Sequence, residues 1–513
     1  MSEHLDIKKT LDFLKETLRF PENVQHRVYG NGQFLQADFS RKKFKEAKDR
    51  FKDTYNRENE SSKTKEVVST IDGKIKALLF AVPAYHKNET YYIAPIRDLV
   101  AKLDDDVEII IYSEISASDA PDGYQHVQED FIKLIKENNK KNFYFIKSKH
   151  SSFSHWIRDP FLPAIDIKAD HVTEVDCIEP FSFSRIGLLE NTRYTQLEKQ
   201  DKDVVESMAD IQTRVPFKFI DRDSNLIFHG GNVLVGDQFI LVGKDYFDLS
   251  KETFNQMLSP QRDNQTIKKY FQEWLSPIEK KEIILVGSRK RTLDGFIKDE
   301  KEPVNLDPNR YNDIADYFSF IPLGKRQPLF HLDMFLTLIG RNTTDDFYHL
   351  AMPHFENASD LPTTPMLKKH LFDRLNNWIK KIASDLESPK ISQKGLKFKV
   401  HYLPTPMTYF KDSTFSRVWF CMSYNNCLLE ATPYGKRAWI PNYRLNVSDD
   451  TNKTLYGNDK LLQKYNEGAA NFFKTLGVNP IQLEHNYLPY MLLAGSVHCA
   501  TSYIKRDVIN TVI

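Results

Sequence analysis

The sequence predicts an α/β fold, because strand-like apolar runs alternate with amphipathic helical patterns along most of its length. No Pro-, Gly- or Ser-rich linker interrupts residues 75–513, so we expect residues 71–513 to form one large domain. The first strand candidates are IKALLFAVPAY (75–85), VEIIIYSE (107–114) and NFYFIKS (142–148), and helical patterns at 96–103 and 127–138 separate them.

Residues 1–70 differ in character from the rest of the chain. LDIKKTLDFLKETL places apolar residues at helical spacing, whereas residues 41–65 are almost wholly polar. We therefore predict a helical, partly mobile N-terminal extension over residues 1–70, outside the core.

The alternation of strands and helices continues to the C-terminus. A last strand is expected after Cys499, and no exact short repeat is visible, so any internal symmetry must be structural. The further strand candidates are 238–245, 281–288, 346–353, 396–404 and 426–442, and the helix candidates are 266–276, 366–386 and 459–477.

Composition limits the classes of function. Lys and Arg number 71 and Asp and Glu 70, so a formal charge of +1 argues against a nucleic-acid partner. Four cysteines without CxxC spacing argue against a disulfide scaffold and a structural zinc site. The N-terminus has no signal-like apolar region and no stretch could span a bilayer, so we expect a cytoplasmic protein with reduced thiols and no membrane partner.

Four short segments carry polar groups beside apolar, strand-like flanks. In SHWIRDPFLP (154–163), Pro160 biases Asp159 towards an extended backbone, and Trp156 offers an aromatic face three residues earlier. Taken alone, Arg158 and Asp159 are typical of a surface turn. In LIFHGGNVLVG (226–236), two glycines interrupt a strand pattern, which indicates either a β-bulge or another group packed closely against the backbone.

The third segment, FHLDMF (330–335), places His331 and Asp333 two residues apart in an apolar run. We expect a buried strand here, with both side chains on one face. The pair is either a buried structural hydrogen bond or a general acid/base beside a cation-binding carboxylate.

The fourth segment, GSVHCATSYIKR (495–506), places Cys499 after a Gly-Ser turn and a neighbouring imidazole, a setting that favours thiolate. Cys177, Cys421 and Cys427 are predicted to be small core residues.

In this order, the segments resemble the guanidino-group-modifying enzymes of the pentein superfamily, which include agmatine, arginine and peptidylarginine deiminases. The matching segments are WIRD (156–159), HLDMFLT (331–337), SYNNCLLE (423–430) and GSVHCAT (495–501). The resemblance implies a five-bladed, pseudo-symmetric α/β propeller of ββαβ-type units over residues 71–513.

The resemblance also implies roles for individual residues. Cys499 would be the nucleophile, His331 the general acid/base, and Asp159 and Asp333 the carboxylates that hold the guanidinium. Further substrate contacts would come from Trp156, Arg158, His229, Gly230, Gly231 and Asn232.

His229 departs from the arginine and agmatine branches, in which an acidic residue commonly precedes the Gly-Gly pair. Two carboxylates remain, as in the peptidylarginine branch, which GSVHCATSYIKR also resembles more closely. That branch binds calcium through acidic residues after its W-x-x-D segment, but Pro160 and Phe161 stand there, so we expect no metal and no cofactor. If His229 faces the substrate, its protonation near about pH 6.5 should lower activity.

The predicted activity is therefore hydrolytic deimination of an arginine residue in a peptide or protein, or of a small arginine derivative. An amidinotransferase could use the same Cys, His and Asp residues, and a non-catalytic binding protein could keep the scaffold. A papain-like peptidase is disfavoured, because it would place its cysteine before its histidine.

Overall fold

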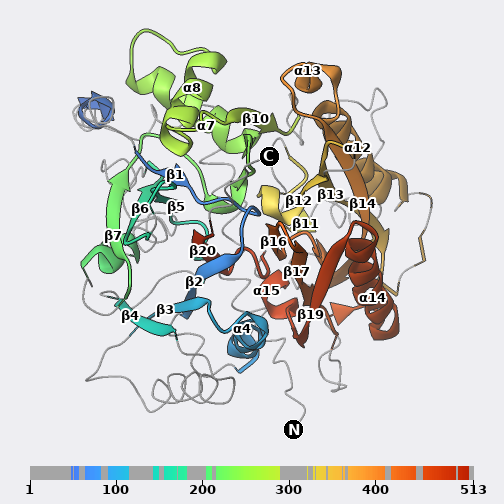
Figure 1. Ribbon diagram of the computed structural model, residues 1–513. Helices are drawn as coiled ribbons and strands as arrows, with labels where there is room; N and C mark the ends of the chain where they lie inside the picture. The colour runs from blue at the N-terminus through green and yellow to red at the C-terminus, as the bar shows by residue number, and fades with distance from the viewer. Residues whose placement is uncertain are drawn as a thin grey trace, which may run out of the picture. The chain divides into compact units, whose positions relative to one another are not determined.

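The structure is a computed structural model, traced in Figure 1, in which the chain forms two compact units. Unit 1 comprises the described residues within 243–245 and 286–497, and unit 2 those within 17–242, 246–285 and 498–513. The structure describes residues 48–49, 51–56, 64–82, 90–114, 142–148, 155–169, 171–181, 204–210, 215–288, 320–321, 327–329, 331–342, 345–360, 362–363, 365, 368–410, 418–445, 455–492 and 495–507.

One sheet of unit 2 joins segments from the two ends of the described chain, in the strand order β20–β2–β3–β4. Strand β20 pairs antiparallel with β2, and β3 pairs parallel with β2 after helix α4. The elements are β2 (Ile75–Val82), α4 (Thr90–Lys102), β3 (Glu108–Glu114), β4 (Phe143–Ser148) and β20 (Thr501–Arg506).

A second sheet of unit 2 has the order β1–β5–β6–β7. Strands β5 and β6 pair antiparallel, and β7 pairs parallel with β6 after a helical segment at 204–210. The strands are β1 (Glu66–Val67), β5 (Leu162–Ile165), β6 (Glu174–Glu179) and β7 (Lys218–Asp223).

The third sheet of unit 2 has the order β10–β9–β8, with β8 antiparallel to β9. Two helices separate β9 from β10, and the Asp263 carboxylate caps the second by accepting a 2.8 Å hydrogen bond from the Thr266 N–H. The elements are β8 (Val233–Val235), β9 (Phe239–Gly243), α7 (Lys244–Met257), α8 (Asn264–Leu275) and β10 (Glu282–Val286).

The larger sheet of unit 1 has the order β11–β15–β14–β13–β12, and β18 also pairs with β14. Strands β12 and β13 pair antiparallel, and β14 pairs parallel with β13 after α12. The elements are β11 (Phe320–Ile321), β12 (Thr337–Asn342), β13 (Phe347–Asn357), the π-helical turn η4 (Lys368–Phe372), α12 (Asp373–Leu386), α13 (Pro389–Ser392), β14 (Phe398–Phe410), β15 (Val418–Cys421) and β18 (Leu455–Tyr456).

The smaller sheet of unit 1 has the order β16–β17–β19, with β16 antiparallel and β19 parallel to β17. Helix α14 separates β17 from β19 and begins after Asn458, whose side chain accepts a hydrogen bond from the Leu461 N–H. The elements are β16 (Leu428–Thr432), β17 (Gly435–Asn442), α14 (Asp459–Thr475), β19 (Val478–Asn486) and α15 (Leu488–Leu492).

The same order of elements recurs in these sheets. In three of them, an antiparallel strand pair is followed in the chain by a helix and by a third strand parallel to the second. In a fourth, β20 from the C-terminal part of the chain supplies the first strand of the pair, and β2 is followed by α4 and by the parallel strand β3. Sheet β10–β9–β8 also begins with an antiparallel pair and continues with helices and a strand. The predicted α/β class is confirmed, whereas the propeller arrangement of the five sheets stays a prediction.

Most predicted strands and helices correspond to elements of the structure, with two corrections. Residues 426–442 form the hairpin β16–β17 and not one strand, because the chain turns at Pro433 and Tyr434 before Gly435, whose φ is +142°. The expected strand 238–245 ends at Gly243, where α7 follows. The helix predicted at 127–138 lies outside the described residues.

Part of the N-terminal segment contributes to the core of unit 2. Residues 51–56 are helical, and Phe51 is fully buried, with its ring 4.9 Å from Phe181 and 5.2 Å from Phe254. The Asn225 side chain donates a 3.0 Å hydrogen bond to the Phe51 carbonyl. The division of the chain at residue 70 stays a prediction, but Phe51 is a core residue.

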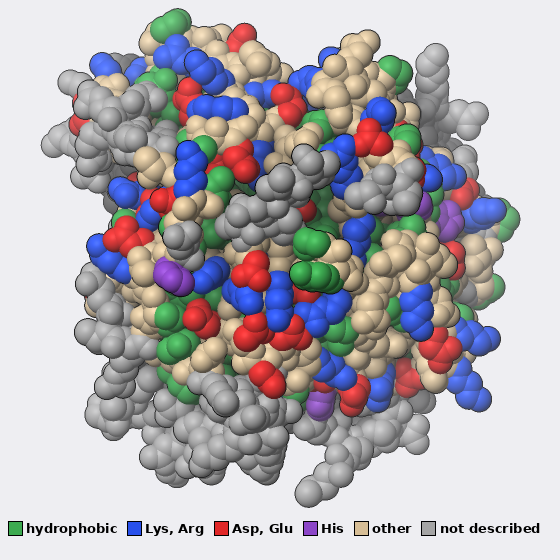
Figure 2. All heavy atoms as spheres, in the orientation of Figure 1, with side chains coloured by type: hydrophobic (Ala, Val, Ile, Leu, Met, Phe, Trp, Pro, Cys, Tyr) green, Lys and Arg blue, Asp and Glu red, His purple; other side chains and the backbone are tan. Residues whose placement is uncertain are grey.

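The surface agrees with the near-neutral composition. On the face drawn in Figure 2, basic and acidic side chains are interspersed. No helix among the described residues is both long and apolar enough to cross a membrane.

Phe51→Ala should lower the free energy of unfolding by about 3–5 kcal/mol, because it removes a fully buried ring. Urea denaturation would measure the change, with Tyr434→Ala, at a residue that is 99% exposed, as the control. Equal stability of the two variants would show that the 51–56 helix does not support the core.

Candidate functional site

A tight turn comes directly before the first strand of the antiparallel pair in each sheet. We call these the pre-strand turns. They are residues 155–160 before β5, 229–232 before β8, 331–334 before β12, 423–426 before β16 and 498–500 before β20. Every candidate site residue from the sequence lies in one of them, which gives the scattered motifs a common structural position.

Within unit 2, Arg158 ties the first pre-strand turn to the turn that carries Cys499. The Arg158 N–H donates to the Cys499 carbonyl at 3.4 Å, and its Nε–H donates to the His498 carbonyl at 3.4 Å. The Thr501 N–H and hydroxyl also donate to the His498 carbonyl, both at 3.2 Å. The backbone around Cys499 is therefore held from both sides.

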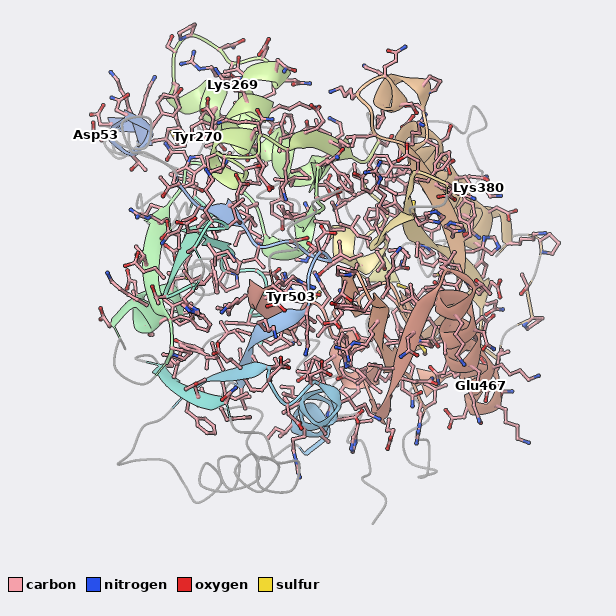
Figure 3. The ribbon with its side chains drawn as sticks, in the orientation of Figure 1. Asp53, Lys269, Tyr270, Lys380, Glu467 and Tyr503 are labelled. Carbon is pink, nitrogen blue, oxygen red and sulfur yellow. The ribbon has the colours of Figure 1, made fainter. Side chains whose placement is uncertain are left out.

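The Arg158 guanidinium is buried against an aromatic ring. It lies 4.4 Å from the centroid of Tyr503, which is labelled in Figure 3, and the Arg506 guanidinium lies 4.1 Å from the same centroid. Arg506 in turn donates to the carbonyls of Thr70, Ile71 and Gly73. These contacts give Arg158 a role in placing Cys499, while its predicted contact with substrate stays a prediction.

The structure gives a steric reason for a glycine at position 230, which the sequence alone did not explain. The segment is a one-turn 3₁₀ helix, η2 (Gly230–Asn232), and β8 starts after it, so of the two alternatives the β-bulge does not hold. A Cβ at Gly230 would lie 2.0 Å from the Arg158 carbonyl oxygen. The close approach of another group to the backbone, the alternative reading, is confirmed.

His229 is held next to Asp159 by a tyrosine. Its Nδ1 lies 3.0 Å from the Tyr246 hydroxyl and 3.9 Å from an Asp159 carboxylate oxygen. Burial lowers the pKa of His229 to about 4, despite the carboxylate nearby. The ring is therefore neutral at pH 7, whereas the expected loss of activity through its protonation stays a prediction.

His155 and Trp156 make a second aromatic pair in the first pre-strand turn. Their ring centroids are 3.9 Å apart, and burial lowers the pKa of His155 to about 3. The Asp159 N–H closes the turn by donating to the Trp156 carbonyl at 3.1 Å. Trp156 and Asp159 thus belong to one rigid turn.

In unit 1, the expected strand at 331–335 is a second one-turn 3₁₀ helix, η3 (Leu332–Met334), and β12 starts only at Thr337. His331 precedes this turn with φ −119° and ψ 150°, close to the −117° and 147° of His229 before η2. His331 and Asp333 are both buried, but they lie in a turn and not on one face of a strand.

Two asparagines that the sequence analysis did not single out bond around this turn. Asn426 bonds to the turn itself, and Asn425 bonds to the neighbouring strands β12 and β13. The Asn426 amide donates to the Asp333 carbonyl at 3.3 Å, and the Asn425 amide donates to the Ala351 carbonyl at 2.9 Å. The SYNNCLLE segment was the available signal, because both asparagines stand in it.

A serine and a tyrosine continue this network in unit 1. The Ser423 hydroxyl donates to the Met334 carbonyl at 2.5 Å, and the buried Tyr443 hydroxyl donates to the Ser423 carbonyl at 2.9 Å. The Tyr443 hydroxyl also lies 3.2 Å from the Ser496 hydroxyl, three residues before Cys499 in the chain.

The other three thiols are core residues, as predicted. All four cysteines are free and buried. Burial raises the pKa of Cys421 and of Cys427 to about 12, and it raises the pKa of Cys177 well above its ordinary value. These thiols therefore stay protonated at neutral pH and are poor nucleophiles.

One acidic group in unit 2 has the spacing of a cation site. Glu179, Asp221 and Asp223 each offer a carboxylate oxygen within 4.8 Å of the others. They lie on β6 and β7 and not after the W-x-x-D segment, so they do not restore the calcium-binding pattern of the peptidylarginine branch.

No protein-family model and no curated protein sequence matches the chain. Among solved structures, it is similar to an agmatine deiminase from C. jejuni, with 12% identity over 86% of this chain and 96% of that one, and a TM-score of 0.45. It is also similar to an adduct of dimethylarginine dimethylaminohydrolase, with 12% identity over 83% of this chain and 99% of that one, and a TM-score of 0.32.

A third similar structure is a DDAH from Pseudomonas aeruginosa complexed with citrulline, with 10% identity over 84% of this chain and 99% of that one, and a TM-score of 0.29. These enzymes belong to the guanidino-group-modifying superfamily that the motifs resemble. With TM-scores of 0.45 or lower, the similarity assigns no role to any residue of this chain.

Gly230→Ala should lower the free energy of unfolding by about 1–3 kcal/mol, because the new methyl group would displace the Arg158 backbone. Urea denaturation measures this effect. Gly468→Ala is the matched control, since a Cβ there meets nothing within 4 Å in helix α14, and it should stabilise by roughly 1 kcal/mol. A Gly230→Ala protein as stable as the wild type would contradict the close packing of these two turns.

Stability should fall as the pH decreases from about 6.5 to 4. The unfolded state protonates its histidines near 6.5, whereas the folded state resists protonation of His229 down to about 4 and of His155 down to about 3. Each pKa unit corresponds to about 1.4 kcal/mol. Urea denaturation at several pH values measures this fall. The free energy of unfolding of His155→Gln should decrease less steeply with falling pH than that of the wild type, while His485→Gln, at an exposed position, should match the wild type.

Proposed function

We propose that the protein hydrolyses a guanidino group to a ureido group and ammonia. One observation carries the proposal. Within unit 2, the turn that contains Arg158 and Asp159 packs against two segments that are far away in the sequence. Arg158 bonds to the backbone of the turn that carries Cys499, and the Arg158 carbonyl packs against Gly230, next to His229. The His229 ring lies 3.9 Å from the Asp159 carboxylate. Attack on a guanidinium requires a nucleophilic thiolate and a carboxylate that holds the cation, and these packed turns carry one residue of each kind.

In the proposed reaction, Asp159 and Asp333 orient the planar cation through paired hydrogen bonds. The Cys499 thiolate attacks the central carbon, a carbon–sulfur bond forms, and His331 protonates the nitrogen that leaves as ammonia. His331 then accepts a proton from water. The hydroxide attacks the covalent thiouronium, a carbon–oxygen bond replaces the carbon–sulfur bond, and the ureido product leaves with the thiolate restored.

The environment of His229 supports an arginine residue in a peptide, or a small arginine derivative, as the substrate. A neutral imidazole bonded to Tyr246 supplies no negative charge for a second cationic group, such as the α-amino group of free arginine. The proposal includes a reducing, cytoplasmic setting, which keeps the four cysteines as free thiols.

An amidinotransferase is the second candidate. The same Cys, His and Asp residues would form the same thiouronium, but an amine would replace water in the second step. A binding protein without activity is the third candidate.

Cys499→Ala should abolish release of ammonia from guanidino substrates while leaving the free energy of unfolding nearly unchanged, because no other group can form the covalent intermediate. Ureido product and ammonia would be measured with an arginine peptide, free arginine and agmatine. Cys177→Ala is the matched control and should retain activity, because that thiol is buried in sheet β1–β5–β6–β7.

Turnover that survives in Cys499→Ala would disprove the proposed nucleophile. Amidino transfer to an added amine, with no ureido product, would favour the amidinotransferase. Wild-type protein that turns over none of the three substrates, with or without an amine acceptor, would favour the binding protein.

A further inference from the structure

Two histidines on neighbouring strands of unit 1 face one another, and neither belongs to a pre-strand turn. His349 lies on β13 and His401 on β14, the parallel strands at the centre of the larger sheet (Figure 1). His349 pairs in register with Lys399, and His401 follows two residues later, so both imidazoles project from the same face.

The ring nitrogens of this pair are in direct contact. Nδ1 of His349 lies 2.8 Å from Nε2 of His401, and the rings are nearly parallel, with centroids 4.9 Å apart and an interplanar angle of 10°. Two nitrogens at this distance must share a positively charged or hydrogen-bonding centre between them, since two lone pairs would repel. A proton or a metal ion can serve.

Asp345 decides which nitrogen of His349 is available. Both of its carboxylate oxygens lie 3.1 Å from Nε2 of His349, and one of them also accepts the Phe347 N–H at 3.2 Å. Nε2 therefore carries the proton and donates it to Asp345, which leaves the lone pair of Nδ1 directed at His401. A carboxylate behind an imidazole is the usual outer partner of a metal-binding histidine.

The surroundings disfavour the charged form of His401, which also keeps access to water. His349 is buried and His401 is half-buried. Burial, followed by the charge of His349, lowers the pKa of His401, so that ring is ready to donate its lone pair at neutral pH. Lys399 is the nearest opposing charge, with its Nζ 3.6 Å from Asp345, so the site has no net negative charge that would attract Ca²⁺ or Mg²⁺.

We propose that His349 and His401, with Asp345 behind His349, bind one divalent transition-metal ion of the zinc, nickel or copper class. Imidazole nitrogens suit these ions, and water would complete the coordination on the side of His401. With zinc–nitrogen bonds of about 2.0–2.1 Å at a tetrahedral angle, the two nitrogens would stand roughly 3.3 Å apart. The ring nitrogens would have to separate by about half an ångström, and both rings would have to rotate so that their lone pairs converge on the ion.

Calorimetric titration of the full-length protein with Zn²⁺ tests the proposal. One ion should bind, with proton release and with affinity that rises from pH 6 to pH 8. His401→Gln should remove this binding, and Asp345→Asn should weaken it by about 10–100-fold. His354→Gln, on the same strand β13, is the matched control and should bind as the wild type does.

X-ray absorption of the zinc-loaded wild type identifies the ligands independently of any variant. The expected result is a shell of nitrogen and oxygen at about 2.0–2.1 Å with imidazole scattering. A sulfur shell at about 2.3 Å would place the ion on a cysteine and overturn the proposal. Binding that is unchanged in His401→Gln, or absent from the wild type, would also overturn it, and none of these readouts depends on guanidino turnover.

Discussion

The pairing of β20 with β2 is the constraint on which the proposed active centre depends. This ladder joins Phe80 to Thr501 and Ile75 to Arg506, so it brings the last described strand into a sheet with β2, more than 400 residues earlier in the chain. Because Thr501 directly follows the turn that carries Cys499, the ladder determines where that thiol lies. Arg506 strengthens it by binding three carbonyls of residues 70–73.

Arg158 fixes the backbone of the turn that this long-range pairing brings into place. Its backbone and side chain donate to the carbonyls of Cys499 and His498, and its own carbonyl leaves room only for a glycine at position 230. A buried guanidinium would be costly without partners, and here the Tyr503 ring and a carbonyl provide them. The position of the Cys499 turn therefore depends on the hydrogen bonds of Arg158, on its packing against Tyr503 and on the absence of a side chain at Gly230.

The histidines His155 and His229 differ from His349 in the groups that contact their rings, and this difference sets what each ring can bind. His155 and His229 are kept neutral by burial, which suits rings that pack beside Trp156 and Tyr246. His349 instead has a carboxylate on one nitrogen and a second imidazole on the other. The hydrogen bond from His349 lowers the pKa of Asp345, so this carboxylate stays ionised as the outer partner of the ring.

The sequence by itself determined the α/β class, the core role of three cysteines and the segments that carry the candidate site, because these depend on local patterns and on residue chemistry. It did not predict that residues 332–334 and 230–232 form single 3₁₀ turns, since three residues are too few to show a periodic pattern of apolar side chains. Only the tertiary structure decided the roles of Arg158, Asn425 and Asn426, and the meeting of His349 with His401. Their partners lie in other segments, up to 340 residues away in the sequence, and a local sequence pattern cannot predict a contact at that separation.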